Sequence, residues 1–149
     1  MVVIVGVYSF RKDLETAKKV EKLFVKKLQT KFPKTYRKTG NFKYYDVVVP
    51  ELDKKIELKF DEMFKDTGNF FIECESRNEP SGITITKSTH WTTIYDDEKG
   101  KKFSKTIETE KLKKIIEEKK PRKVMGGDKD PETGEKTSWG YLVKLKDIK

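Results

Sequence analysis

Two short apolar segments, separated by only five residues, constrain the fold of this chain most strongly. They are Tyr44–Val49 and Lys55–Phe60, and both are rich in the β-branched and aromatic residues that favour strands. The connection between them, Pro50 to Lys54, is turn-like. We therefore expect the two strands to lie side by side, with a tight reversal of the chain between them.

Side chains two residues apart on a strand point to the same face of a sheet. Glu57 and Lys59 therefore project from one face of the second strand, while the apolar residues between and around them project from the other. The reversal returns Glu57 beside Asp46, so two carboxylates and one amine are expected to converge at the edge of a sheet. The alternative is that Asp46 caps a strand and that Glu57 and Lys59 form an exposed polar face with a cross-strand pair.

A long amphipathic helix is predicted from about Arg11 to Lys31. Its apolar residues fall on one arc at 100° per residue, opposite a lysine-rich face. Glu21 is the exception, because it lies at the centre of the apolar arc. A carboxylate there is either paired with a partner on the sheet or directed into a site. The apolar residues of the arc are Leu14, Ala17, Val20, Phe24, Val25, Leu28 and Phe32.

The remaining elements complete a single domain, because 149 residues suffice for one core and no linker divides the chain. Helix, several strands, helix and strand is the order of an α/β sandwich with a mixed sheet. Gly126-Gly127 is interpreted as a turn. The further predicted elements are strands at Met1–Val7, Phe70–Glu75, Trp91–Tyr95 and Tyr141–Leu145, and a helix at Thr109–Lys120.

Composition narrows the class of partner. The formal charge of +9 comes from 34 Lys and Arg against 25 Asp and Glu, and it favours a polyanion such as nucleic acid. A lysine-rich surface also arises from genome composition or a hot habitat. One cysteine and one histidine exclude an internal disulfide, a cysteine-based zinc site and histidine clusters. The opening apolar segment is too short to span a bilayer and lacks a basic leader, so we expect a soluble, intracellular protein with no membrane partner.

The expected convergence of two carboxylates and an amine suits phosphodiester hydrolysis. Oxygen ligands are those that Mg²⁺ prefers, and Mg²⁺ commonly takes one or two carboxylates and keeps several waters. The metal activates a water molecule, and the amine orients or deprotonates it. A lysine beside a metal has a depressed pKa, which helps it to act as a base.

The pattern Asp46…Glu57-Leu58-Lys59, after a helix with an inward Glu21, resembles the PD-(D/E)xK nuclease superfamily. Tyr45 stands where the eponymous proline would be. The combined run is similar to a phage- and virus-type branch described as endonucleases or Holliday junction resolvase-like proteins, and it covers roughly residues 43–95. That run comprises Glu57 to Met63, Thr67 to Glu73, Pro80 to Ile83, and Thr86-Lys87 before Trp91.

The resemblance implies a restriction-endonuclease-like α/β fold with an αβββαβ core, in which helices flank a mixed central sheet. It implies that Asp46 and Glu57 ligate Mg²⁺, for which Mn²⁺ would substitute. The carbonyl of Leu58 would be a further ligand, and Lys59 would serve the attacking water. Glu21 would complete the catalytic site directly or through a water molecule.

Five other residues have a functional and an ordinary interpretation. Glu73 reaches the metal-site face and supports the ligands from behind, or it is a salt-bridged strand residue. Lys87 holds a substrate phosphate, or it is an ordinary surface lysine. Asp61 binds a second metal or, as we favour, has a strand-end role. His90 is interpreted as structural, and Cys74 as a core thiol.

Three hypotheses follow. The first is a Mg²⁺-dependent DNA endonuclease that leaves a 5′-phosphate, as the resemblance implies. It would be selective for branched DNA or Holliday junctions, because a small basic domain suits shape readout, and it would be a homodimer that cuts two strands symmetrically. The second is a non-catalytic basic nucleic-acid-binding protein. The third is a structural interaction subunit whose charge is incidental.

Overall fold

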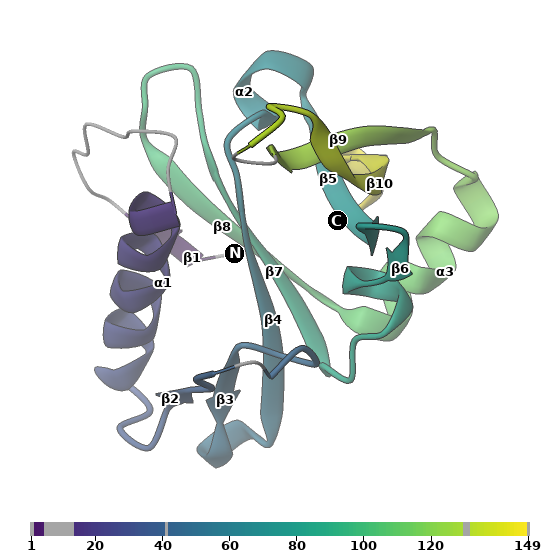
Figure 1. Ribbon diagram of the computed structural model, residues 1–149. Helices are drawn as coiled ribbons and strands as arrows, with labels where there is room; N and C mark the ends of the chain where they lie inside the picture. The colour runs from purple at the N-terminus through teal and green to yellow at the C-terminus, as the bar shows by residue number, and fades with distance from the viewer. Residues whose placement is uncertain (1, 5–13, 41, 130–131, 149) are drawn as a thin grey trace.

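The computed structural model describes residues 2–4, 14–40, 42–129 and 132–148, which form two β-sheets and three α-helices (Figure 1). Sheet A has the strand order β1-β8-β7-β4-β3-β2, and sheet B has the order β6-β5-β10-β9. The elements are β1 (Val2–Ile4), α1 (Leu14–Gln29), β2 (Tyr36–Arg37), β3 (Val47–Val49), β4 (Lys54–Asp61), α2 (Phe64–Thr67), β5 (Asn69–Ser76), β6 (Glu79–Pro80), β7 (His90–Asp96), β8 (Lys102–Glu108), α3 (Thr109–Lys119), β9 (Lys123–Lys129) and β10 (Lys136–Lys144).

Sheet A is mixed, as expected. Its central pair, β4 and β7, is parallel, whereas the other pairs are antiparallel. The expected mixed α/β class is therefore confirmed. The three strands that follow α1 in the prediction do not all join one sheet, however, because β5 pairs with β10 in sheet B.

Helix α1 covers one face of sheet A, at the left of Figure 1. The part of the predicted apolar arc whose side chains the structure describes forms this core, because Val20, Phe24 and Val25 are buried against the sheet. The sheet contributes the valines of β3 and the alternate apolar residues of β4. The buried sheet residues of this core are Val47, Val49, Ile56, Leu58 and Ile94.

A second core lies on the other side, where sheet A meets sheet B and α3. Trp91 and Tyr95 of β7 pack with Phe70 and Ile72 of β5, and Leu112 of α3 is fully buried among them. The predicted core thiol, Cys74, is also part of this core and is buried. Sheet A thus has apolar contacts on both faces. On the face opposite α1, only the part that sheet B and α3 do not cover is left for polar side chains.

The predicted strands and helices largely coincide with observed elements, with several differences. Strand β3 is shorter than expected, and β2, β6, β8, β9 and the short helix α2 were not predicted. Gly126-Gly127 lies within β9 rather than in a turn. The reason is tertiary, because the ring of Phe71 lies against the backbone at two glycines. A Cβ on Gly126 or Gly140 would approach that ring to 2.7 or 2.6 Å.

Parts of two predicted elements lie outside the described residues, namely Met1 and Val5–Val7 of the first strand and residues 11–13 of the first helix. The described part of the first strand is β1. Among the helices that the structure describes, none is both long and apolar enough to cross a membrane.

The 3₁₀ turn Gly82–Thr84 generates a stability prediction. Gly82 has φ +49°, and a Cβ there would lie 2.1 Å from the carbonyl oxygen of Glu73. Gly100 also has a positive φ, +79°, but a Cβ there would meet nothing within 4 Å. We expect Gly82→Ala to lower the free energy of unfolding by about 2–5 kcal/mol, because the added methyl group clashes with β5 as well as straining the backbone. Gly100→Ala should lower it by about 1–2 kcal/mol, because only the left-handed backbone is strained there.

Urea unfolding of the two variants beside the unmodified chain measures this difference. The pair is matched, because both substitutions add one methyl group at a left-handed glycine. Equal losses of stability would contradict the close approach of the turn to β5.

Candidate active site

The pairing of β3 with β4 places Asp46 beside Glu57. Val47 pairs with Ile56 and Val48 with Lys55. Continuing this register by one residue puts Asp46, which lies just before β3, opposite Glu57. The backbone N–H of Leu58 donates a 2.7 Å hydrogen bond to Oδ2 of Asp46, whose own N–H donates to the carbonyl of Ile56 at 2.9 Å. Asp46 is therefore fixed to β4 through both its main chain and its side chain.

Glu57 and Lys59 project together from the polar face of β4. The Nζ of Lys59 lies 3.2 Å from Oε2 of Glu57. The Glu57 side chain is only 7% exposed, whereas that of Lys59 is 35% exposed, so the amine is the solvent-facing member of the pair. The structure thus brings together the three residues for which the sequence predicted a common site.

The Glu57 carboxyl is held in its neutral form by its surroundings. Its pKa is raised from 4.5 to about 8: burial is the largest cause, the ammonium of Lys59 lowers the pKa, and the charge and a hydrogen bond of Asp46 raise it. The buried Glu57 and the half-buried Asp46 thus carry less negative charge together than two free carboxylates. A cation bound between them would favour the charged form of Glu57 and lower its pKa.

Lys59, in contrast, is held in its charged form by its surroundings. Burial lowers its pKa, but the charges of Glu57, Glu73 and Asp46 together raise it above the ordinary value. This differs from the depressed pKa expected for a lysine beside a metal, because three carboxylates act on the amine. The charge of Glu73 on β5 is one of them, which is consistent with both interpretations of Glu73, a residue that supports the ligands and a salt-bridged strand residue.

Glu21 does not join these residues. Its Oε1 accepts a 2.9 Å hydrogen bond from Nε of Arg37 on β2. Arg37 pairs with Val47, whose side chain packs in the core beneath α1. Glu21 therefore lies on the α1 face of sheet A, whereas Glu57 projects from the other face. The prediction that Glu21 completes the site is not supported, and its alternative, a partner on the sheet, is what the structure shows.

The other predicted site residues have distinct positions. The buried side chain of Leu58 packs beneath α1, between the two polar residues of β4. Lys87 is exposed, and its backbone N–H donates to the carbonyl of Tyr44 at 3.1 Å, two residues from Asp46. Asp61 accepts backbone hydrogen bonds from Met63 at 3.0 Å and from Phe71 at 2.8 Å, which fits the favoured strand-end role.

His90 has a local hydrogen bond, as its structural interpretation suggested. Its Nδ1 lies 2.8 Å from the hydroxyl of Thr89, and burial lowers its pKa. The adjacent Trp91 was not predicted to belong to the site. It pairs with Glu57 across the parallel strands, and its buried indole N–H has no hydrogen-bond partner among the described residues. This donor is left for a water or ligand oxygen.

The donor set fits Mg²⁺ better than a metal that requires a closed protein cage. Within the described residues, no three His, Cys, Asp or Glu side chains gather as a metal-binding group. Asp46 and Glu57 provide two carboxylates, and Mg²⁺ commonly takes one or two and keeps its waters. Lys59 and Glu73 then lie at the rim of such a site rather than among the ligands.

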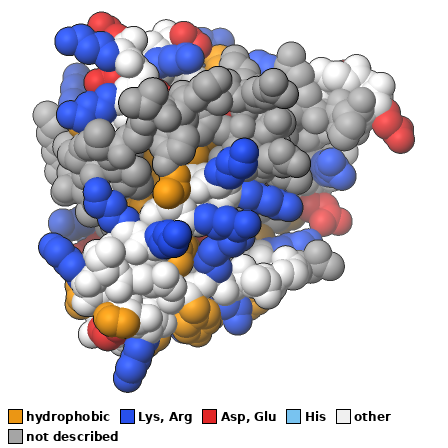
Figure 2. Space-filling view, turned by 90° about the vertical axis from the view of Figure 1, so that its left-hand side faces the viewer, with side chains coloured by type: hydrophobic (Ala, Val, Ile, Leu, Met, Phe, Trp, Pro, Cys, Tyr) orange, Lys and Arg blue, Asp and Glu red, His pale blue; other side chains and the backbone are white. Residues whose placement is uncertain are grey.

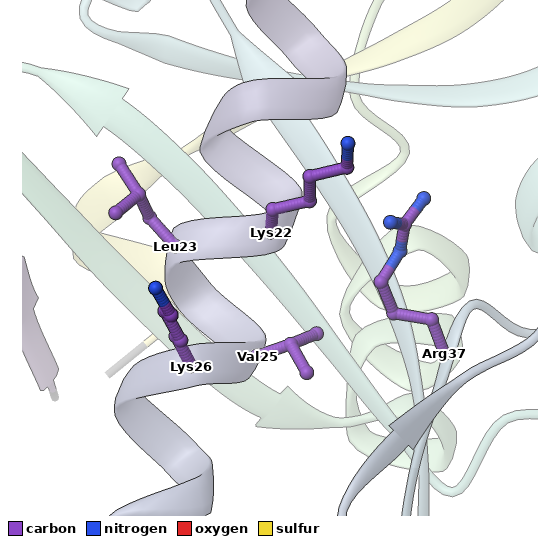
Figure 3. A pocket seen from close by; sticks show the side chains of 5 residues that line it. All are labelled: Lys22, Leu23, Val25, Lys26 and Arg37. Atoms are coloured by element: carbon purple, nitrogen blue, oxygen red, sulfur yellow. The ribbon is translucent and has the colours of Figure 1, made fainter.

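Two shallow hollows lie away from these residues. One is lined by α1 and β2 residues and has Lys22, Lys26 and Arg37 around an apolar floor (Figure 3). The other lies between α3 and the end of β10 and includes Lys119, Arg122 and Lys144. Neither contains Asp46, Glu57 or Lys59, so both are surface features rather than parts of the carboxylate site.

Comparisons of the chain with models of protein families, with curated protein sequences and with solved structures find no match. The resemblance to the PD-(D/E)xK nucleases therefore depends on the motif residues themselves and on how the structure arranges them.

The raised pKa of Glu57 generates a pH prediction. A carboxyl whose pKa is about 8 when folded and 4.5 when unfolded stabilises the fold below pH 4.5, and this contribution is lost as the pH rises through 8. We expect the metal-free protein to melt roughly 5 °C or more lower at pH 9 than at pH 6.5. Thermal unfolding in EDTA, followed by circular dichroism, measures this.

Glu57→Gln is the matched variant, because the amide keeps the shape of the side chain but does not ionise. Its melting temperature should change much less over the same range of pH. A fall of equal size in both proteins would show that another group is responsible.

Proposed function

We propose that the protein is a metal-dependent endonuclease that hydrolyses phosphodiester bonds in DNA. One observation carries the proposal, namely the buried carboxyl of Glu57 and the half-buried carboxylate of Asp46, held together beside the amine of Lys59. A structural salt bridge needs one carboxylate for one amine. A second carboxyl group close to the first retains a proton. This arrangement destabilises the fold unless a cation replaces that proton.

Each residue has a role in this proposal. Asp46 and Glu57 would hold the metal, and the Leu58 carbonyl would be a further ligand. A bound Mg²⁺ supplies Lewis-acid chemistry at the phosphodiester. Lys59, protonated and partly exposed, hydrogen-bonds the phosphate or orients the attacking water. Glu73 keeps the amine charged and positioned. Loading of the site displaces the proton from Glu57, so metal affinity should rise with pH.

The charge of the molecule supports DNA as the substrate. The surplus of nine positive charges attracts a polyanion. Figure 2 shows mostly basic charged side chains on the side of the molecule that carries α1. Lys87 lies nearer the site and is the residue that we expect to hold a phosphate. The exposed lysines of α1 are Lys18, Lys19, Lys22, Lys26 and Lys27.

The proposal also includes a fold family, a preferred DNA substrate and an oligomeric state. A restriction-endonuclease-like αβββαβ core is supported by the packing of α1 on a mixed sheet whose β3–β4 pair bears the carboxylates. Selectivity for branched DNA and a twofold dimer are supported by the motif resemblance and by the need to cut two strands.

A second candidate is a basic nucleic-acid-binding protein without catalysis. The ion pair between Glu57 and Lys59 favours it, because a protonated Glu57 leaves the cluster internally satisfied without a metal. In that case Asp46, Glu57 and Lys59 form a structural ion cluster, and the protein binds DNA without cutting it.

Cleavage assays decide between these functions. We expect Mg²⁺-dependent cutting of labelled DNA that EDTA abolishes and that Glu57→Gln or Asp46→Asn removes. Lys59→Met should slow cutting by at least about 100-fold while leaving the fold intact. Glu110→Gln is the matched control, because that carboxylate is 86% exposed on α3 and makes only a 3.7 Å ion pair with Lys113.

Linear duplex and four-way junction DNA should be compared in the same assay. Faster cutting of the junction would support the resolvase assignment. Tight junction binding with no cutting under Mg²⁺ or Mn²⁺ would instead favour the non-catalytic protein, and the absence of any salt-dependent affinity for DNA would contradict both.

A further inference from the structure

Three aromatic rings cluster on the surface immediately before Asp46. The ring of Phe42 lies 5.6 Å from that of Tyr44 and 4.6 Å from that of Tyr45, both at steep interplanar angles. Phe42 is 37% exposed and Tyr44 is 38% exposed. Large aromatic side chains usually gain stability by burial, so an exposed group of them next to a candidate active site indicates a surface that contacts a ligand.

Each ring of this aromatic cluster has a lysine over it. The Nζ of Lys38 lies 4.5 Å from the centroid of Phe42, and that of Lys87 lies 4.4 Å from the centroid of Tyr44. The Nζ of Lys55 lies 5.4 Å from the ring of Tyr45. The lysines come from three separate parts of the chain. Alternating rings and ammonium groups are what proteins use to bind single strands, because the rings stack bases and the cations contact phosphates.

Hydrogen bonds fix the position of the cluster. The carbonyl of Tyr44 accepts one bond from the hydroxyl of Thr86 at 3.0 Å and another from the N–H of Lys87. The hydroxyl of Thr86 also forms a 2.8 Å hydrogen bond with the hydroxyl of Ser88. The hydroxyl of Ser88 lies 2.9 Å from that of Thr109 at the start of α3. The backbone that carries the rings is therefore anchored to the interior, which lowers the entropic cost of binding.

The register of sheet A places this surface beside the carboxylates. The N–H of Lys38 donates to the carbonyl of Asp46 at 2.8 Å. Lys55 lies two residues before Glu57 on the same face of β4, which corresponds to about 7 Å along a strand. A strand whose phosphate reaches Glu57 thus has its neighbouring bases within reach of the rings.

From these contacts we propose that the aromatic cluster stacks the bases of an unpaired DNA strand beside the carboxylate site. The proposal rests on the proposed nuclease function and specifies its substrate as DNA that is single-stranded next to the cleaved bond. On binding, each lysine moves from its ring to a phosphate and leaves the ring face to a base. The exchange is favourable because an exposed cation–π contact is weaker than base stacking.

Metal-free binding assays test the proposal separately from cleavage. In EDTA, fluorescence anisotropy compares labelled oligothymidylate of about 12 nucleotides with an abasic strand of the same length and charge. We expect the protein to bind the base-bearing strand more tightly. Phe42→Ala and Tyr44→Ala should each weaken that binding by roughly 5- to 100-fold and leave binding of the abasic strand unchanged.

Two further variants control for folding and for loss of apolar surface. Tyr44→Phe keeps the ring and should retain the affinity of the unmodified protein. Met125→Ala removes an equally exposed apolar side chain, 45% exposed, from β9 in sheet B and should have no effect. Equal affinity for the two strands, no affinity for either, or an equal loss for both in the alanine variants would overturn the proposal.

The result is also distinguishable from that of the cleavage assay. Cutting of DNA without base-dependent binding would leave the nuclease standing and remove the stacking surface. Base-dependent binding without cutting under Mg²⁺ would leave the stacking surface standing and contradict the nuclease.

Discussion

The hydrogen bond from the Leu58 N–H to the Asp46 carboxylate fixes the geometry on which the rest of the site depends. Asp46 lies just before β3 begins, where a strand end would otherwise fray. Held by this bond, Asp46 stays close to Glu57 as that side chain becomes buried. The repulsion between the two carboxylates follows from this proximity and adds to the effect of burial on Glu57, while Lys59, two residues along β4, acts in the opposite direction. This side-chain-to-backbone contact thus fixes the contribution of Asp46 to the electrostatics of the site.

Another lysine, Lys102, shows why Lys59 is unusual. Lys102 on β8 is fully buried, pairs with Asp96, and lies 4.8 Å from the ring of Phe60. Burial lowers its pKa, although the charges of Asp96 and Glu62 act in the other direction. Lys59 is more exposed, and the charges of Glu57, Glu73 and Asp46 together raise its pKa. Lys102 has the character of a structural ion pair, whereas the surplus of negative charge around Lys59 is typical of a site that accepts a cation.

Local patterns in the sequence were enough to predict the elements whose residues alternate or repeat regularly. The β3–β4 pair was among them, and because a register follows from alternation, so was the meeting of Asp46, Glu57 and Lys59. Strand β8 escaped prediction because five of its seven residues are polar or charged outside a clear alternation. Strand β9 escaped because its Gly126 is required by the ring of Phe71, which is distant in sequence.

The position of Glu21 illustrates a different limit. Helical periodicity correctly predicts that Glu21 faces inward, but it does not reveal which face of the sheet the helix covers. Arg37, its partner, lies in a two-residue strand with too short a pattern to recognise. The aromatic cluster was missed for a related reason, since a sequence of aromatic residues resembles a buried strand. Only the exposed fractions of Phe42 and Tyr44 distinguish a surface from a core.

The pairing of β5 with β10 has a consequence for how the molecule assembles. Between the parallel strands β4 and β7 the chain leaves sheet A, forms β5, and returns. Strand β5 finds its main partner in β10, some 60 residues further along the chain. The segment between β4 and β7 therefore pairs with β10, which comes much later in the chain. The contacts between β5 and β10 are thus distant in the sequence, and contacts of this kind slow the folding of a chain.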